Sequence, residues 1–144
     1  MNRVYCDANI VIAIFVRETS SARIQSWVAD PSVGVVISDL TVLEFTLAIS
    51  RLIRERKLDS IEARSILSRF ELWRAALGRP ITITRQMFAL ARTIVEDAAL
   101  GVRGPDALHL ALLQVTGLPF ATFDARLARA ADAIGLATLE PPPL

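Results

Sequence analysis

The sequence has very little cysteine and histidine, and this scarcity narrows the chemistry that the chain can perform. Cys6 is the only cysteine and His109 the only histidine among the 144 residues. A single cysteine excludes an internal disulfide and a cysteine-based zinc site, and it is typical of a protein from a reducing compartment. A catalytic triad or a metal site that needs imidazole would have to use His109.

Long apolar runs and nucleotide-binding glycine loops are also missing. The apolar stretch from Ile10 to Val16 is too short to span a bilayer, and no cleavage site of small residues follows it. No Gly-x-x-x-x-Gly-Lys sequence occurs, which excludes a P-loop. We therefore expect a cytoplasmic protein that has no association with a membrane.

Composition and length predict one folded domain. Hydrophobic residues make up 53% of the chain and charged residues 22%, a balance that excludes intrinsic disorder. A chain of this length buries roughly two thirds of its unfolded surface, which is enough for a core. No linker or repeat divides the sequence, so we expect a single domain over residues 1–144. Its last residues, 139–144, should form an irregular tail in which Pro141 to Pro143 end the fold.

Short runs rich in β-branched residues alternate with longer helical patterns, and this alternation predicts an α/β fold. The runs that favour strands are 3–6, 33–38, 81–83, 120–123 and 136–139. The helical patterns cover roughly 40–57 and 60–77, and three more begin after Thr84, at Gly104 and after Asp124. We therefore predict a three-layer fold, a mostly parallel five-stranded sheet with helices on both faces.

Three of the predicted helices have signals of their own. Ser38 or Asp39 is available to cap the helix that begins near Leu40. Asp59 or Ser60 begins the second helix, with Glu62 placed for a capping box. The helix after Thr84 carries a predicted apolar stripe. The stripe consists of Phe88, Ala91, Ile94 and Val95.

Four acidic residues lie where the strands of such a sheet end, or in the first turns of the helices beside those ends. They are Asp7, Glu44, Asp106 and Asp124. Ligands of parallel sheets bind at the carboxyl ends of the strands, so we predict that the four acids share one site. The alternative for Asp124 is a helix cap, and for Asp106 a favourable charge near a helix N-terminus.

Two of these acids stand among apolar neighbours. Glu44 interrupts a helix that is apolar on nearly all sides, and Asp7 stands between the apolar segments 4–6 and 10–12. A buried carboxylate needs a partner or a cation. Oxygen ligands without cysteine or histidine favour hard cations, so we predict Mg²⁺ or Mn²⁺. Such ions activate water and stabilise a leaving oxygen, which favours phosphodiester hydrolysis.

Four sequence blocks surround these acids. They are 5–9 (Tyr-Cys-Asp-Ala-Asn), 38–44 (Ser-Asp-Leu-Thr-Val-Leu-Glu), 104–111 (Gly-Pro-Asp-Ala-Leu-His-Leu-Ala) and 121–127 (Ala-Thr-Phe-Asp-Ala-Arg-Leu). Together they resemble the PIN-domain ribonucleases, and within them most closely the VapC toxins of bacterial toxin–antitoxin pairs. The likeness covers nearly the whole chain.

The resemblance implies a metal-dependent endoribonuclease, the toxin of a toxin–antitoxin pair, that hydrolyses structured RNA such as transfer RNA or ribosomal RNA. It implies that Asp7 and Asp106 are the main metal ligands. Glu44 and Asp124 would complete the acidic site, directly or through water. The positions of Asn9 and Thr122 match polar residues that support the site in the family. A VapB-like antitoxin and a homodimer are the partners that the resemblance implies.

Ala8 departs from the family pattern, in which Thr or Ser usually follows the first Asp. The change removes a hydroxyl near the metal. The alternative function is therefore a catalytically weak or inactive PIN module that binds protein or RNA, although all four acids are intact. Receiver domains and haloacid-dehalogenase-like phosphatases also place Asp at a strand end. Receiver domains need a Lys at a late strand, and the phosphatases need an acid at the position where this chain has Asn9. Both requirements argue against these two families.

Basic residues near the predicted site are candidates for RNA contacts. Arg51 and Arg54 lie at the end of the first long predicted helix, where they complement the helix C-terminus, bind phosphates or do both. Arg103 precedes Asp106 and is a weaker candidate. His109 lies one turn after Asp106, and a packed, hydrogen-bonded histidine is favoured there over an RNA contact.

The formal net charge of +1 does not argue against an RNA substrate. The chain has 15 acidic and 16 basic residues. When the four predicted site acids are set aside, 11 acids remain, and the rest of the molecule has a surplus of five positive charges. The near-neutral total is therefore the average of a basic body and an acidic site.

Overall fold

The computed structural model describes residues 2–139, in which strands and helices alternate. Three strands form a parallel sheet in the order β2–β1–β3. The strands are β1 (Asn2–Cys6), β2 (Val33–Val36) and β3 (Phe120–Ala121). The α-helices in this part of the chain are α1 (Ala8–Phe15), α2 (Ser21–Ala29), α3 (Asp39–Arg54), α4 (Ser60–Ala76), α5 (Arg85–Glu96), α6 (Gly104–Thr116) and α7 (Ala125–Ala133). A short 3-10 helix, η1 (Ala98–Leu100), follows α5.

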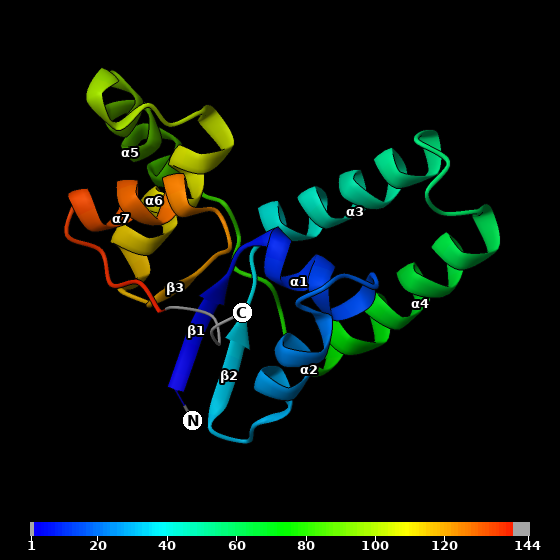
Figure 1. Ribbon diagram of the computed structural model, residues 1–144. Coiled ribbons are helices and arrows are strands. Elements are labelled where there is room, and N and C mark those ends of the chain that lie inside the picture. Colours follow the sequence, from blue (N-terminus) through cyan, green and yellow to red (C-terminus); the bar gives the residue numbers. More distant parts are fainter. Residues whose placement is uncertain (1, 140–144) are drawn as a thin grey trace.

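Helices cover both faces of the central strand β1 (Figure 1). Successive side chains of a strand point to opposite faces. Tyr5 therefore packs with α5, α6 and α7, whereas Val4 and Cys6 pack with α1 and α2. The α3–α4 hairpin packs beside α1 around a third apolar cluster. The predicted three-layer α/β fold is confirmed.

The sheet is narrower than predicted, because the two outer segments contribute single bridges instead of strands. Ile81 pairs with Ser38 beyond β2, and Thr138 pairs with Phe120 beyond β3, both in parallel. The residue before Ile81 is a proline without an N–H, and the helix cap Thr84 follows three residues later. Little extended chain is left there for a ladder of hydrogen bonds.

The five predicted helices are present, and their caps agree with the sequence signals. Ser38 caps α3, and Asp59 forms a capping box with Glu62 at the start of α4. Helices α1 and α2 were not predicted from the sequence. Helix α1 is apolar around most of its surface, so it lacks the periodic pattern that reveals an amphipathic helix.

The predicted apolar stripe of α5 is correct in part. Ala91 and Ile94 are buried together with Met87, which the prediction left out. Phe88 and Val95 are exposed at 57% and 44%. Residues 87, 91 and 94 are spaced by four and three, so they share the buried face, and each residue one position further along is rotated by about 100° away from it.

Two sequence predictions fall wholly or partly outside the described residues. The irregular tail at 139–144 is described only at Leu139, and the single domain over 1–144 stays a prediction. Within residues 2–139, no helix is long and apolar enough to cross a membrane.

The carboxyl ends of the strands bring separate parts of the chain to one edge of the sheet. Asp7 follows β1 at once, Ser38 lies just beyond β2, and Thr122 follows β3. The first turns of α1, α3 and α7 begin at this edge. The polar residues of three loops are therefore neighbours although they are far apart in the sequence.

The core beneath this edge can be tested with Phe70→Ala in α4. Phe70 is 1% exposed and stacks on Phe45, with ring centroids 4.1 Å apart. We expect the change to lower the free energy of unfolding by about 3–5 kcal/mol. The matched control is Leu72→Ala in the same helix, where the side chain is 77% exposed and the expected loss is below about 0.5 kcal/mol. Urea denaturation followed by circular dichroism measures both, and equal losses would contradict the packing described.

Candidate functional site

Asp7 stands between β1 and α1, and its carboxylate is nearly buried. Its Oδ1 caps α1 by accepting a hydrogen bond from the N–H of Ala8 at 2.7 Å. Its Oδ2 accepts hydrogen bonds from the Thr122 hydroxyl at 2.7 Å and from Nδ2 of Asn9 at 3.2 Å. Burial raises the pKa of the Asp7 carboxyl above its usual range, although His109 and the Thr122 hydrogen bond oppose this effect.

Thr122 and Asn9 tie Asp7 to the loop that follows β3. The Thr122 oxygen accepts hydrogen bonds from Nδ2 of Asn9 at 3.1 Å and from the N–H of Asp124 at 3.0 Å. Oδ1 of Asn9 accepts a hydrogen bond from the N–H of Phe123 at 3.1 Å. These contacts are the ones that the predicted supporting role of Asn9 and Thr122 requires, because they hold the Asp7 carboxylate in one orientation.

His109, in the second turn of α6, joins Asp7 to Glu44. Its Nε2 lies 2.5 Å from Oε1 of Glu44 and 3.6 Å from Oδ1 of Asp7. One possible ligand atom from each of the three residues lies within 4.8 Å of the other two. The imidazole is 1% exposed, so the prediction of a packed, hydrogen-bonded histidine is confirmed.

The other nitrogen of this imidazole is held by Tyr5. The Tyr5 hydroxyl lies 2.7 Å from Nδ1 of His109, 2.8 Å from Oγ of Ser38 and 3.3 Å from Oγ1 of Thr41. Burial raises the pKa of the Tyr5 hydroxyl, so it stays protonated. Each of these three hydroxyls can both donate and accept a hydrogen bond. The hydroxyl network therefore accommodates the neutral and the charged form of the imidazole. The ring is fixed with Nε2 toward the carboxylates.

The two carboxylates decide the charge of His109. Burial by itself would lower the pKa of the imidazole. The hydrogen bond from Nε2 to Glu44, together with the charges of Asp7, Glu44 and Asp106, outweighs burial and raises the pKa above its ordinary value. The protein alone thus favours an imidazolium between the carboxylates.

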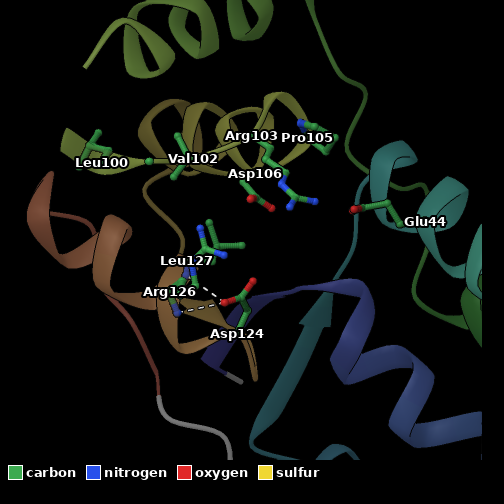
Figure 2. A pocket seen from close by; sticks show the side chains of 10 residues that line it. Glu44, Leu100, Val102, Arg103, Pro105, Asp106, Asp124, Arg126 and Leu127 are labelled. Atoms are coloured by element: carbon green, nitrogen blue, oxygen red, sulfur yellow. Dashed lines mark hydrogen bonds between the residues drawn. The ribbon is translucent and has the colours of Figure 1, made fainter. Parts of the chain in front are cut away.

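Asp106 and Asp124 line an adjoining pocket of about 340 Å³ and are not part of the tight group. Glu44 lines the same pocket (Figure 2). Its contact with His109 links the pocket to the group that contains Asp7. Oδ1 of Asp124 also caps α7, as the alternative for this residue predicted. Within residues 2–139 the four predicted acids therefore do not form one tight cluster; Glu44 is shared by two adjacent groups. The reason is that Asp106 and Asp124 stand at helix starts beside the pocket, whereas Asp7 is buried.

Arg103 and Arg126 line this pocket as well. Arg103 is one of the predicted candidates for RNA contacts. Arg126 was not predicted from the sequence, and its only signal was its position two residues after Asp124 at the start of a helix.

Arg51 and Arg54, the other candidates, lie elsewhere. They belong to the last turn of α3, roughly 10–15 Å along the helix from Glu44. Arg51 forms an ion pair with Glu55 at 3.1 Å, and Arg54 donates a hydrogen bond to Ser50 at 2.9 Å. They are not among the residues that line the pocket, and their RNA contacts stay a prediction.

The donor set suits a hard divalent cation. Oδ1 of Asp7 has a lone pair beyond its bond to Ala8, and Oε2 of Glu44 accepts no hydrogen bond from the described residues. Both are carboxylate oxygens, the ligands that Mg²⁺ and Mn²⁺ prefer. The raised pKa of His109 favours a hydrogen-bond donor over a metal ligand, because only neutral imidazole binds a metal.

The chain matches known proteins in sequence and in fold. The PIN domain family matches residues 4–133. The structure of FitAcB from Neisseria gonorrhoeae is 23% identical, with a TM-score of 0.76 over 98% of this chain and 99% of that chain. VapC20 of Mycobacterium tuberculosis, a toxin that cleaves the sarcin-ricin loop, is 17% identical, with a TM-score of 0.69 over 96% of this chain and 99% of that chain.

A third similar structure is VapBC2 from Rickettsia felis, bound to a DNA fragment from its promoter. It is 17% identical, with a TM-score of 0.65 over 96% of this chain and 98% of that chain. No curated protein sequence matches significantly. At these identities the structural likenesses show the fold alone.

The buried imidazole makes a pH dependence testable. The pKa of His109 in the folded protein lies above the ordinary value of 6.5, so the folded state binds more protons than the unfolded state between 6.5 and the raised value. The stabilisation is complete below 6.5, and the free energy of unfolding should fall as pH rises through the raised pKa. The raised pKa of Asp7 has the same effect at lower pH: it makes the free energy of unfolding fall as pH rises above 3.8.

Because His109 is the only histidine, NMR of its ring protons in metal-free buffer gives its pKa directly. Urea denaturation at several pH values gives the slope of the free energy of unfolding against pH. His109→Gln should flatten this slope above pH 6.5. The NMR measurement on the wild type decides the prediction even if the variant fails to fold. A titration midpoint of His109 at or below 6.5 would contradict the contacts between the imidazole and the carboxylates.

Proposed function

Because the chain belongs to the PIN domain family, we propose that it is a metal-dependent endoribonuclease and the toxin of a toxin–antitoxin pair. One observation carries the proposal: the carboxylates of Asp7 and Glu44 meet at a buried imidazole, beside a pocket that Asp106 and Asp124 also line. The PIN fold and its likeness to FitAcB and VapC20 support a nuclease. The proposed substrate is structured RNA, either transfer RNA or ribosomal RNA.

The residues of the site fit Mg²⁺ or Mn²⁺. Asp7 and Glu44, whose carboxylates converge, would hold the ion in place of the pair Asp7 and Asp106 that the resemblance implies. Asp106 and Asp124 would complete the acidic site from the pocket, directly or through water. A bound ion of this kind supplies a water of lowered pKa and stabilises the leaving oxygen of a phosphodiester.

The protein's own groups hold the ligands in place. Thr122 and Asn9 engage Oδ2 of Asp7, so Oδ1 is the atom that stays available toward His109. His109 engages Oε1 of Glu44 and leaves Oε2. The carboxylates that line the pocket would orient an attacking water through hydrogen bonds. Such fixed positions are what a hydrolytic site needs, because a small misplacement of reacting groups lowers the rate strongly.

The alternative is an inactive or weak PIN module that binds RNA or protein. Ala8 favours this alternative, because it is buried next to Asp7 and offers no hydroxyl to the site. The four intact acids favour the enzyme. Both functions would use the same pocket. A cleavage assay therefore distinguishes them, whereas a binding assay does not.

Cleavage of RNA tests the enzyme. With Mg²⁺ or Mn²⁺ the wild type should cleave transfer RNA or ribosomal RNA, and EDTA should abolish the reaction. Asp7→Asn should lower the rate by more than about a hundredfold, since it removes a charged ligand and even outer contacts of a metal site are worth 10–100-fold. The matched control is Asp30→Asn, an exposed acid in the turn before β2, which should keep the rate. Equal cleavage by wild type and Asp7→Asn, or none with either metal, would refute the nuclease.

We propose two protein partners, a second copy of the chain and a small VapB-like antitoxin. Large apolar side chains are exposed on several helices; among them, Leu43 and Leu47 are each 55% exposed one turn apart on α3, and Phe88 is 57% exposed on α5. Exposed apolar groups of this size are typical of surfaces that another protein covers. Together with the RNA substrate, these partners fit the expected cytoplasmic location.

Sedimentation velocity tests the partners. The purified chain should sediment as a dimer, and addition of the small protein encoded beside it should give a heavier complex with suppressed RNA cleavage. The physical reason is that binding covers apolar surface and blocks access to the pocket. A monomer at micromolar concentration that ignores the small protein would contradict both partners, whatever the outcome of the cleavage assay.

A further inference from the structure

Two guanidinium groups stand in the acidic pocket without an ion-pair partner among residues 2–139. Arg103 is the N-cap residue of α6, and Arg126 is the second residue of α7. Among the described residues neither lies within 4.0 Å of a carboxylate oxygen, although three acids, Glu44, Asp106 and Asp124, line the same pocket. In the view of Figure 2 the Arg103 guanidinium lies in the space between Glu44 and Asp106.

A metal ion alone does not account for these arginines. A positive group next to a cation site repels the cation, so Arg103 and Arg126 weaken metal binding to the carboxylates around them. An anionic ligand accounts for both. The planar guanidinium donates two parallel hydrogen bonds to the oxygens of one phosphate, which makes arginine well suited to a nucleic-acid backbone.

The backbone around both residues strengthens this attraction. Each arginine stands at the start of a helix, and the positive end of the helix dipole favours an anion there. The carboxylate of Asp124 accepts hydrogen bonds from the N–H groups of Arg126 and Leu127 at 3.0 and 3.2 Å, so the backbone that carries Arg126 is fixed. Arg103 makes no side-chain capping bond, and its guanidinium stays available to the pocket.

We propose that Arg103 and Arg126 bind two backbone phosphates of a single RNA strand, one on each side of the bond that is cut. The strand would then lie across the pocket, with the intervening phosphate toward Glu44. The pocket has a volume of about 340 Å³, near the lower end of small-molecule sites, and this size suits a single strand. This inference rests on the proposed nuclease function and adds how the substrate is positioned.

The salt dependence of RNA binding tests the proposal. A short, fluorescein-labelled, single-stranded RNA of mixed sequence is titrated with Asp7→Asn protein in Mg²⁺ at several KCl concentrations. Adding Arg103→Gln or Arg126→Gln should reduce the slope of log affinity against log salt by about 0.7 each, the value for one phosphate contact on a single strand. The matched control is Arg129→Gln, an exposed arginine one turn further along α7 that does not line the pocket. The slope for this control should equal that of the Asp7→Asn protein without a second change.

Cleavage kinetics in the otherwise wild-type protein give a second readout. Each variant should raise KM by up to about fivefold, the range of one exposed ion pair, and leave kcat unchanged. Slopes equal to that of Arg129→Gln would overturn the proposal. Faster cleavage by the variants at limiting Mn²⁺, without a change of slope, would also overturn it, because the arginines would then act only against the metal. If the wild type cleaves no RNA but the slopes still fall, the phosphate contacts stand and the nuclease proposal fails.

Discussion

The buried carboxylate of Asp7 is the constraint on which the rest of the site depends. A carboxylate with so little contact with water is stable as an anion only where hydrogen bonds and a positive charge surround it. Ala8, Asn9 and Thr122 provide the hydrogen bonds, and His109 provides the charge. These partners belong to segments that pack around the end of β1. The geometry of the site therefore depends on how β1 packs against its helices.

The site consists of a buried half and an open half, and the two halves have different physical properties. In the buried half, Asp7 and His109 are fixed through Thr122 and through the Tyr5 hydroxyl. In the open half, carboxylates and guanidiniums face a pocket at the starts of α6 and α7. Glu44 belongs to both halves. A cation bound between Asp7 and Glu44 would take over the neutralising role that His109 fills in the protein alone, which couples metal binding to the charge of the imidazole.

The predictions from sequence succeeded where the signal was local. The cap signals at Ser38 and Asp59 marked two helices correctly, and Asp7 lies at the carboxyl end of β1 as expected. They failed where packing decides. Phe88 was assigned to the buried face of α5, but a shift by one residue rotates a side chain by about 100°. Helix α1 was missed because it is apolar on most sides and has no periodic pattern.

The sequence by itself determined which groups are available for chemistry: four candidate acids near the ends of strands and the starts of helices, one histidine and one cysteine. Only the tertiary structure decided which of these groups touch. Glu44 and His109 are 65 residues apart in the chain, and Tyr5 and His109 are 104 apart. No local pattern encodes such a distance, because it results from how α3 and α6 pack around the end of β1. The same packing placed Asp106 and Asp124 at the pocket and left Asp7 buried beside it.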